Sequence, residues 1–483
     1  MSEKFYHSIM RLSYLIALLL LMVPRALAEG LPELGEASQT TLSPLQERRL
    51  GENIMREIRA DPSYFDDPPL SEYLNTLGYR LISSSDDPKT GLELFVIRDN
   101  ELNAFSLPGG FIGVNTGLIL LAQSESELAS VLAHEIGHVT QHHIARILAT
   151  QKWTLATTLA GLAVAILAAR SSSQLSQAAI IGTQAAAAQN QLNFTREHEQ
   201  EADRIGLQTL DKAGFDVRAM PAFFEHMQKA TRFIEGNAPS YLRTHPVTFE
   251  RIADIQNRVQ NMRYRQVPDS QNFQFLRARL RAQEAPPKDA IAYFENSLQE
   301  KKYSSEAPQR FGLATALLRA RNIERAEREL VQLRKVAQPS PLIELLAGEL
   351  KLAQGKGAEA ASIYLAALKS YPQYRPLVYA SCEVFLQNRQ PQDSLKLISD
   401  QLQFYPQDYR LYLLQAKSYA VLDKKLLQHK SQAEAYYLLG NLRGAVEQLQ
   451  IAQKSGDGDF YQLSAVEARL KELRAIEAET RKQ

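Results

Sequence analysis

The chain is poor in cysteine, tryptophan and net charge. Cys382 is the single cysteine among 483 residues, so no disulfide can form within the chain. Lys and Arg number 55 against 54 Asp and Glu, a formal net charge of +1, and no long basic run appears. This balance gives no support for nucleic-acid binding and is that of an evenly charged, solvated surface. Hydrophobic residues at 45% and charged residues at 23% are typical of a globular protein. Because no disulfide can form within the chain, the hydrophobic core alone must stabilise it.

The first residues have the three-part pattern of a secretory signal. A positively charged start precedes the apolar run Leu12–Val23, and Ala26-Leu27-Ala28 places small residues where a signal peptidase cleaves. The apolar run is too short to span a bilayer comfortably. We therefore expect residues 1–28 to be a signal peptide cleaved after Ala28, with an uncleaved anchor as the alternative. Because no cysteine lies near this site, lipid attachment there is excluded.

A second uncharged stretch, Trp153–Ala169, lies in the middle of the first half of the chain. Its length is at the lower limit for a membrane span, and it is rich in Ala, Thr and Gly. We expect a helical hairpin that is buried or covers a groove, and no firm membrane span. A membrane contact and a mobile lid over the site are the alternatives.

Local signals predict several elements before and around this stretch. Caps and prolines predict two helices, at 44 to about 59 and at 68 to about 83. Strand-like runs predict two strands, Leu92–Ile97 and Phe111–Val114. A capping box of Ser124 and Glu127 begins a third helix. Pro108-Gly109-Gly110 predicts a turn between the strands. Phe111–Asn115 is interpreted either as a sheet edge that a substrate segment could join or as an ordinary core strand.

The third helix carries His134-Glu135-Ile136-Gly137-His138. One helical turn separates the two histidines, so both imidazoles share a face and can bind one metal ion. Glu135 is adjacent and can act as general base on a water that the metal activates. The alternative is two histidines on a polar helix face without a metal. His142 and His143 extend this helix, and we interpret them as structural or surface groups.

A catalytic zinc ion needs a third protein ligand, and residues 196–203 are the obvious source. Glu199 and Asp203 are four residues apart and share a helix face. We predict Glu199 as the third ligand and Asp203 as a residue that hydrogen-bonds a ligand histidine or the reacting groups. Glu201 and, less so, His198 remain competing candidates.

The C-terminal half has a repeat of 34 residues. Small residues, and large ones that follow them, recur at this step in three series, namely Ala314, Gly348, Cys382 and Ala416; Ala326, Ala360 and Ser394; and Leu330, Tyr364 and Ile398. Ala433 and Ala445 restart the pattern after a slip near Lys424, and Ala290 with Phe294 suggests a partial earlier unit. The period and the small residues are typical of tetratricopeptide repeats, in which paired helices touch. Cys382 is then a packed core residue, and His429 a surface residue.

These motifs resemble the M48 peptidases. The resemblance rests on the His-Glu-Ile-Gly-His motif, on Glu-x-Glu-Ala-Asp-x-x-Gly at Glu199–Gly206, and on Asn103-Ala104-Phe105 and Pro108-Gly109-Gly110 upstream. It implies one zinc ion held by His134, His138 and Glu199, Glu135 as catalytic base and Asp203 as proton donor. Thr244-His245-Pro246 is similar to a segment whose histidine occupies the fourth zinc position and silences the enzyme, so we predict His245 as a regulatory fourth ligand.

A signal peptide combined with tetratricopeptide repeats is similar to one periplasmic branch of that family. The resemblance implies an endopeptidase that degrades stalled or misassembled outer-membrane β-barrel proteins, assists their assembly, and contacts the outer-membrane assembly machinery through its repeats. The expected fold class is α+β, mainly α. The expected segments are a signal peptide (1–28), a flexible lead (29–43), a zincin-like M48 metallopeptidase domain with a small sheet (44–265) and an α-solenoid of repeats (266–483).

Two alternatives come from other classes. The chain could be a chaperone or scaffold whose repeats do the main work, with proteolysis secondary. Two histidines and a carboxylate can also hold Fe²⁺ in oxygenases, but the spacing with Glu135 between the histidines favours zinc hydrolysis.

Overall fold

The computed structural model describes residues 42–151, 195–231 and 240–480. Within these ranges the chain forms one three-stranded sheet and otherwise helices, which confirms the predicted fold class. The predicted signal peptide, the predicted lead up to residue 41 and Trp153–Ala169 lie outside the described residues. None of the helices described combines the length and hydrophobicity that crossing a membrane requires.

The N-terminal half packs helices around the sheet. The strands are β1 (Glu93–Ile97), β2 (Ala104–Leu107) and β3 (Phe111–Asn115). The helices are α3 (Pro44–Ala60), α4 (Pro68–Ile82), α5 (Thr116–Leu121), α6 (Glu125–Thr140), α7 (His143–Gln151), α10 (Arg196–Lys212), α11 (Ala219–Thr231), α12 (Ser240–Thr244) and α13 (Phe249–Gln260). The predicted helices and strands are all present within a residue or two of their expected bounds, and β2 is the strand that the prediction missed.

The predicted helix starts are formed by side-chain caps. Ser43 Oγ accepts from Gln46 N, and Gln46 Oε1 accepts from Ser43 N, which completes the capping box of α3. Ser124 caps α6 by accepting from Glu127 N. The carboxylate of Glu127 accepts from Gln123 N, one residue before the cap, so only half of the second capping box forms as predicted.

The strand order is β1-β3-β2, with β1 parallel and β2 antiparallel to β3. β3 is therefore the central strand and all of its residues are buried. The interpretation of Phe111–Asn115 as a free sheet edge is wrong, because both sides of β3 already carry a hydrogen-bonded strand. The core-strand interpretation is the correct one.

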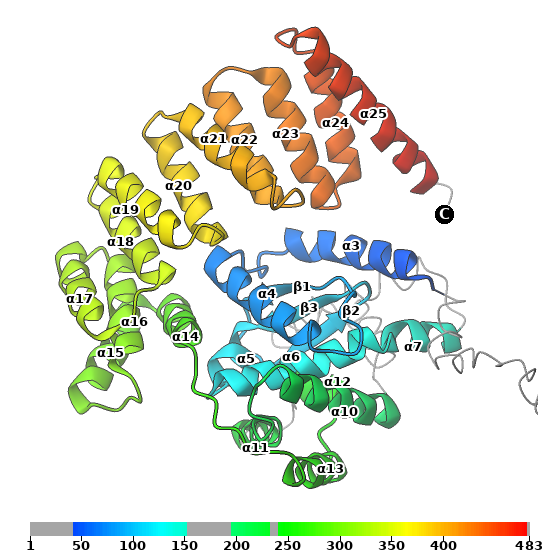
Figure 1. The fold of residues 1–483 in the computed structure, drawn as a ribbon, viewed down its shortest axis with the longest axis vertical. Helices are drawn as coiled ribbons and strands as arrows, with labels where there is room; N and C mark the ends of the chain where they lie inside the picture. Colours follow the sequence, from blue (N-terminus) through cyan, green and yellow to red (C-terminus); the bar gives the residue numbers. More distant parts are fainter. Residues whose placement is uncertain (1–41, 152–194, 232–239, 481–483) are drawn as a thin grey trace, which may run out of the picture.

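Both faces of the sheet are covered, because alternate side chains of a strand point to opposite faces. Leu94 and Val96 of β1 pack in a core cluster with α4 and α6, whereas Phe95 and Ile97 pack in another with α3. Figure 1 shows α3 on one side of the sheet and α6 on the other. Burial on both faces explains why Leu94 to Ile97, the buried part of β1, are all apolar.

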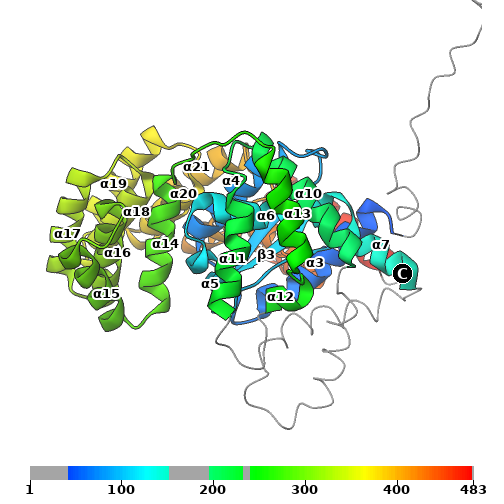
Figure 2. The same cartoon turned by 90° about the horizontal axis from the view of Figure 1, so that it is seen from below.

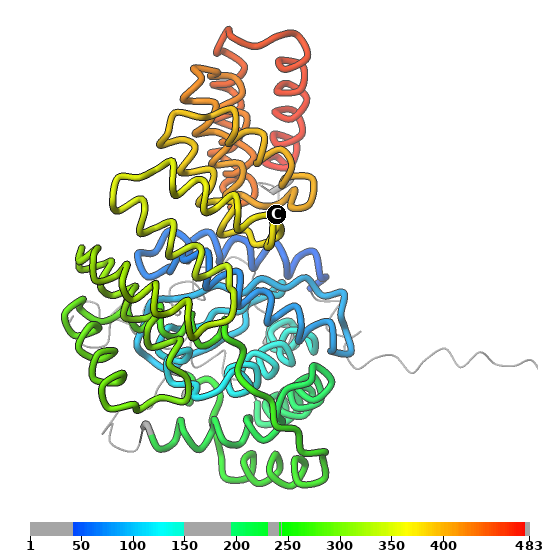
Figure 3. The backbone as a smooth tube through the Cα atoms, turned by 60° about the vertical axis from the view of Figure 1, so that its left-hand side comes forward, coloured from blue at the N-terminus to red at the C-terminus, as the bar shows by residue number. Residues whose placement is uncertain are grey.

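The C-terminal half is an array of paired helices. They are α14 (Gln271–Glu284), α15 (Pro287–Glu300), α16 (Glu306–Arg319), α17 (Ile323–Val336), α18 (Pro341–Ala353), α19 (Gly357–Ser370), α20 (Arg375–Gln387), α21 (Pro391–Leu402), α22 (Tyr409–Val421), α23 (Lys425–Leu438), α24 (Leu442–Gln453) and α25 (Phe460–Thr480). Figures 1 and 3 show them as an arc that begins at α14 and returns over α3 with α22 to α25.

Small residues of one helix face large residues of its partner, as the period of 34 predicts. A Cβ atom on Gly348 would lie 2.0 Å from Tyr364 Cε1, and one on Gly312 would lie 2.2 Å from Phe294 Cζ. Cys382 is fully buried, and burial raises the pKa of its thiol to about 12. These contacts confirm the packing role of Cys382 and of the small positions.

The predicted slip near Lys424 corresponds to a change in the pairing of helices. In earlier pairs, Ala326 and Ala360 occupy the fourth position of each second helix, α17 and α19. Helix α23 packs as a second helix against α22 and also against α24, where Ala445 again occupies the fourth position. Ala433 of α23 follows Ala416 of α22 by 17 residues instead of 34, so the repeat shifts by half a unit.

The two halves share one core and several ion pairs. The core cluster around α4 and α6 continues into α14, α16 and α18, and the rings of Tyr73 and Phe273 lie 6.4 Å apart. Further along the arc, Arg375 Nη2 lies 2.7 Å from Glu72 Oε2, and Arg410 pairs with Asp66. Figure 2 shows α14 between the sheet-containing half and α15 to α19. The arc is therefore held against the N-terminal half at its beginning and its middle.

Candidate metal centre

Helix α6 supplies the first two candidate ligands. All of its residues are buried, including His134, Glu135 and His138. The two histidines lie one turn apart with their Nε2 atoms 3.0 Å from each other. The predicted convergence of both imidazoles on one point is therefore present in the structure.

Two glycines let α10 approach α6 closely. A Cβ atom on Gly206 would lie 2.9 Å from His134 N, and one on Gly137 would lie 3.0 Å from Ala202 O. Such short distances would force the helices apart, so the missing side chains set their separation. The glycine at the end of the Glu-x-Glu-Ala-Asp-x-x-Gly motif thus has a packing reason.

Helix α10 brings Glu199 to the two histidines. Glu199 Oε1 lies 3.3 Å from His138 Nε2, and its Oε2 lies 3.6 Å from His134 Nε2. One turn later, Asp203 Oδ1 lies 2.9 Å from His134 Nδ1, on the far side of that ring. The shared helix face predicted for Glu199 and Asp203 places one carboxylate at each nitrogen of His134.

His245, just after α12, completes the cluster. Its Nδ1 lies 2.8 Å from Glu199 Oε1, and its Nε2 lies 3.5 Å from Glu135 Oε1. One ligand atom from each of His134, His138, Glu199 and His245 lies within 4.8 Å of the others, and all four side chains are buried.

The donors fit a zinc ion in number, type and protonation state. Three imidazoles and a carboxylate are borderline ligands that zinc binds in tetrahedral sites. Burial lowers the pKa of His138 well below its usual value, so its ring is neutral, as a metal ligand must be. Burial would raise the pKa of Glu199, but the charges and hydrogen bonds of His245 and His138 outweigh it and lower the pKa, so Glu199 is ionised.

Glu135 lies beside the cluster rather than in it. Among the described residues, neither of its carboxylate oxygens has a hydrogen-bond partner in good geometry, although the side chain is fully buried. Burial is the main reason that the pKa of Glu135 is raised above its usual value. A buried carboxylate with unsatisfied oxygens and a raised pKa is typical of a catalytic acid or base.

The sequence analysis missed Arg251 on α13. Its Nε and Nη2 donate to Asp203 at 2.7 and 2.8 Å, and its Nη1 lies 2.6 Å from Glu199 Oε2. Burial would raise the pKa of Asp203, but the hydrogen bonds of His134 and Arg251 outweigh it and lower the pKa. No local motif marks Arg251, because its partners lie about fifty residues away in the sequence.

The competing candidates lie elsewhere. Glu201 Oε2 accepts from Arg146 Nη1 at 2.9 Å and is partly exposed, and the ring of His198 stacks on His143 with centroids 4.5 Å apart. His142 is partly exposed and lies 2.9 Å from Glu47. His143 is not a surface group, because it is fully buried and its Nδ1 lies 2.8 Å from His138 Nδ1.

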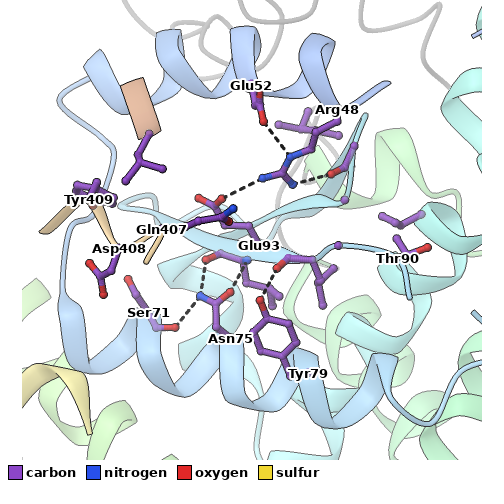
Figure 4. Close-up of a pocket in the computed structure, with 18 of the residues that line it drawn as sticks. Arg48, Glu52, Ser71, Asn75, Tyr79, Thr90, Glu93, Gln407, Asp408 and Tyr409 are labelled. Atoms are coloured by element: carbon purple, nitrogen blue, oxygen red, sulfur yellow. Dashed lines mark hydrogen bonds and ion pairs between the residues drawn. The ribbon is translucent and has the colours of Figure 1, made fainter. Parts of the chain in front are cut away.

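A cleft of about 1070 Å³ runs from this cluster to the helical array. His138 and Ser106 line its inner part, and the connection between α21 and α22 lines the opposite wall. Figure 4 shows Gln407, Asp408 and Tyr409 of the array in the same pocket as Asn75 and Tyr79 of α4. His138 is thus the one member of the cluster among the residues that line this cavity, which the array closes on another side.

One wall of the cleft is the outer edge of β1, where side chains already form hydrogen bonds with the strand's backbone groups. Asn75 Nδ2 donates to Leu94 O and Asn75 Oδ1 accepts from Leu94 N, both at 2.9 Å, while Tyr79 donates to Leu92 O. The amide of Asn75 thus occupies the place of a neighbouring strand. A peptide cannot pair with β1 at Leu94 unless it displaces Asn75.

Comparison with known proteins places the chain in a family. Residues 68–259 match the model of peptidase family M48. The β-barrel assembly-enhancing protease of Escherichia coli K12 is 33% identical over 457 residues, which cover 93% of this chain and 92% of that protein. The putative β-barrel assembly-enhancing protease of Vibrio cholerae is 39% identical over 63% of each chain.

More distant similarity reaches a mitochondrial enzyme. The mitochondrial metalloendopeptidase OMA1 of Schizosaccharomyces pombe is 34% identical over 220 residues, which cover 44% of this chain and 60% of that protein. With this match, the family model and the almost full-length relatives, the chain belongs to the β-barrel assembly-enhancing protease family within the M48 metallopeptidases.

Proposed function

We propose that the protein is a zinc endopeptidase whose ion is held by His134, His138 and Glu199. The observation that carries this proposal is the buried convergence of these donors beside Glu135. A zinc ion bound here would polarise the scissile carbonyl and lower the pKa of a bound water toward about 7. Glu135 takes a proton from the attacking water and delivers it to the leaving amine, a role that suits its raised pKa.

We assign Asp203 to positioning rather than to proton donation. Its carboxylate receives two hydrogen bonds from Arg251 and lies against His134 Nδ1, and these partners lower its pKa. A carboxylate that is held ionised is a poor proton donor, but it orients a ligand imidazole well. This assignment differs from the proton-donor role that the family resemblance implied.

His245 is proposed to keep the enzyme latent. Its ring lies against both Glu199 and Glu135, and this supports the proposal that it takes the fourth ligand position in place of a catalytic water. Replacing His245 with Ala should raise the rate of proteolysis, and replacing the partly exposed His429 in the array should leave it unchanged. Equal or lower activity in a folded His245→Ala variant would remove the gate from this account.

The substrates are proposed to be unfolded or stalled outer-membrane β-barrel proteins in the periplasm. The cleft that joins the cluster to the helical array supports a protein substrate, and the names of the bacterial relatives support this client class. The array is further proposed to contact the outer-membrane assembly machinery. A crosslinking survey with probes at Gln407 and Tyr409, in the cleft, should capture such clients.

Holding clients without cleaving them is a second candidate function. It is favoured by the cleft, whose walls come from both halves of the chain. Cells that carry Glu135→Gln decide between the two, because a holding function would survive the substitution and a proteolytic one would not.

The proposed function is tested by metal analysis and by cleavage of an unfolded protein. The mature chain should contain about one zinc ion rather than iron. Glu135→Gln should keep the zinc and lose cleavage by about 10²–10⁴-fold. Glu197→Gln, on the exposed side of α10, is the matched control. Bound zinc without cleavage in any variant would favour the holding function.

A further inference from the structure

His143 connects the metal cluster to a second group of polar residues. The side chain is fully buried, and its Nδ1 lies 2.8 Å from Nδ1 of His138. Its other ring nitrogen lies 3.2 Å from Glu201 Oε2, which also accepts from Arg146 Nη1. A continuous chain of contacts therefore runs from His138 through His143 to a partly exposed carboxylate.

The atoms in these contacts fix the direction of the hydrogen bonds. His138 turns Nε2 toward His134 and Glu199, so a neutral His138 ligand carries its proton on Nδ1. Nδ1 of His143 lies at hydrogen-bond distance and accepts that proton. A neutral His143 then carries its own proton on Nε2, where Glu201 accepts it.

The backbone is bent to make this contact. In one continuous helix, residues five positions apart point roughly 140° away from each other, so His143 would not meet His138. Helix α6 ends at Thr140, and His142 has a φ of 49°, in the left-handed region. Its side chain is held by Glu47 at 2.9 Å. The turn lets α7 begin at His143, with the ring against His138.

We propose that His143 and Glu201 are positioning residues that fix the tautomer and ring orientation of His138 for metal binding. Asp203 contacts His134 directly, whereas His138 reaches its carboxylate through an intervening imidazole. The inference rests on the proposed metal site. It gives a function to two residues that the peptidase mechanism does not otherwise use.

The test is zinc affinity of the mature chain, measured by competition with a chelator. His143→Leu removes the acceptor and should lower zinc affinity by about 10–100-fold, the usual effect of losing such an outer partner. His143→Asn can place a side-chain oxygen near the position of Nδ1. It should therefore retain affinity within a few-fold of the wild type, although the two variants remove the same ring.

Glu201 offers a test that leaves the buried core intact. Glu201→Gln keeps the shape of the side chain but weakens the acceptor, and we expect a several-fold loss of zinc affinity. Glu197→Gln removes an exposed carboxylate from the same helix and should change nothing. In the cobalt-substituted protein, His143→Leu should also shift the visible absorption bands, and His143→Asn should restore them.

The outcomes separate this inference from the proposed function. A wild-type chain that binds no zinc defeats the proposed function and the inference together. Wild-type affinity in both His143→Leu and Glu201→Gln overturns only the positioning role. Equal loss in the Leu and Asn variants, with equally lowered thermal unfolding temperatures of the metal-free chains, would make His143 a packing residue. If His143→Leu does not fold, the zinc affinities of Glu201→Gln and Glu197→Gln test the positioning role by themselves.

Discussion

The two halves of the molecule use buried positions in opposite ways. The helical array buries small and large apolar side chains against each other, as Gly348 and Tyr364 show. Helix α6 of the peptidase half buries His134, Glu135 and His138 in its middle, where polar groups need partners from distant helices. The comparison teaches that local repetition specifies the array, whereas long-range contacts specify the site. The substitutions below test this difference from the largest expected effect to the smallest.

Removing Arg251 should show the difference most strongly. Arg251 lies between the buried carboxylates of Asp203 and Glu199, and its loss removes the guanidinium that pairs with both. Arg251→Met should therefore reduce the free energy of unfolding of the metal-free chain by about 3–5 kcal/mol. In the array, Arg443→Met removes an exposed pair with Glu447 and should cost under about 0.5 kcal/mol. The measurement is denaturant unfolding. Similar losses of unfolding free energy in Arg251→Met and Arg443→Met would contradict the difference between the two halves.

Removing one carboxylate from α10 should distinguish the proposed metal ligand Glu199 from its neighbour Glu201. Glu199→Ala should lower zinc affinity by more than about 100-fold, since an outer partner alone is worth about 10–100-fold. Glu201→Ala should have the smaller effect, because Glu201 contacts His143 and Arg146 rather than the cluster. The measurement is chelator competition, and the reverse order would make Glu201 the ligand.

Filling a small position should damage the array and spare the site. A Cβ on Gly348 meets the ring of Tyr364, so Gly348→Ala should lower stability by about 1–3 kcal/mol. Ala366→Val, on the exposed side of α19, is the control and should cost roughly the difference in helix propensity, a few tenths of a kcal/mol. Zinc content should remain that of the wild type in both. Loss of zinc from Gly348→Ala would show that metal binding in the N-terminal half depends on the packing of the array.

The contact between Glu47 and His142 should give the smallest effect, and one that depends on pH. The hydrogen bond that His142 donates to Glu47 raises the pKa of His142 above its usual value. The stabilisation is therefore complete below the unfolded pKa near 6.5 and is lost as pH rises through the higher folded pKa. The difference in free energy of unfolding between the wild type and Glu47→Gln should be under about 1 kcal/mol at low pH. This difference should shrink as the pH rises. Glu57→Gln, on the exposed side of α3, should show no such trend.

Features that depend on nearby residues were predictable from the sequence. The capping box of α3, the convergence of His134 and His138, and the period of 34 all follow from spacing along one element. Features that depend on packing were not. β2 is short, and the predicted turn at Pro108-Gly109-Gly110 joins β2 to β3 rather than β1 to β3. The central place of β3 depends on two other strands.

The missed site residues have the same explanation. Arg251 meets its carboxylates across helices α13 and α10, and the sequence around it has no distinguishing motif. His143 could be suspected from its closeness to the His-Glu-Ile-Gly-His motif, but its contact with His138 depends on the turn at His142. Local spacing identifies candidate ligands, and tertiary packing selects their partners.

X-ray absorption at the zinc edge, on wild type and His245→Ala, tests the central claim most directly. The account predicts imidazole and carboxylate ligands at about 2.0–2.2 Å in the wild type. In His245→Ala one imidazole should be replaced by water, and cleavage of an unfolded protein should rise. An unchanged zinc spectrum in His245→Ala, or a zinc ion without histidine ligands in the wild type, would contradict a latent zinc peptidase at this site.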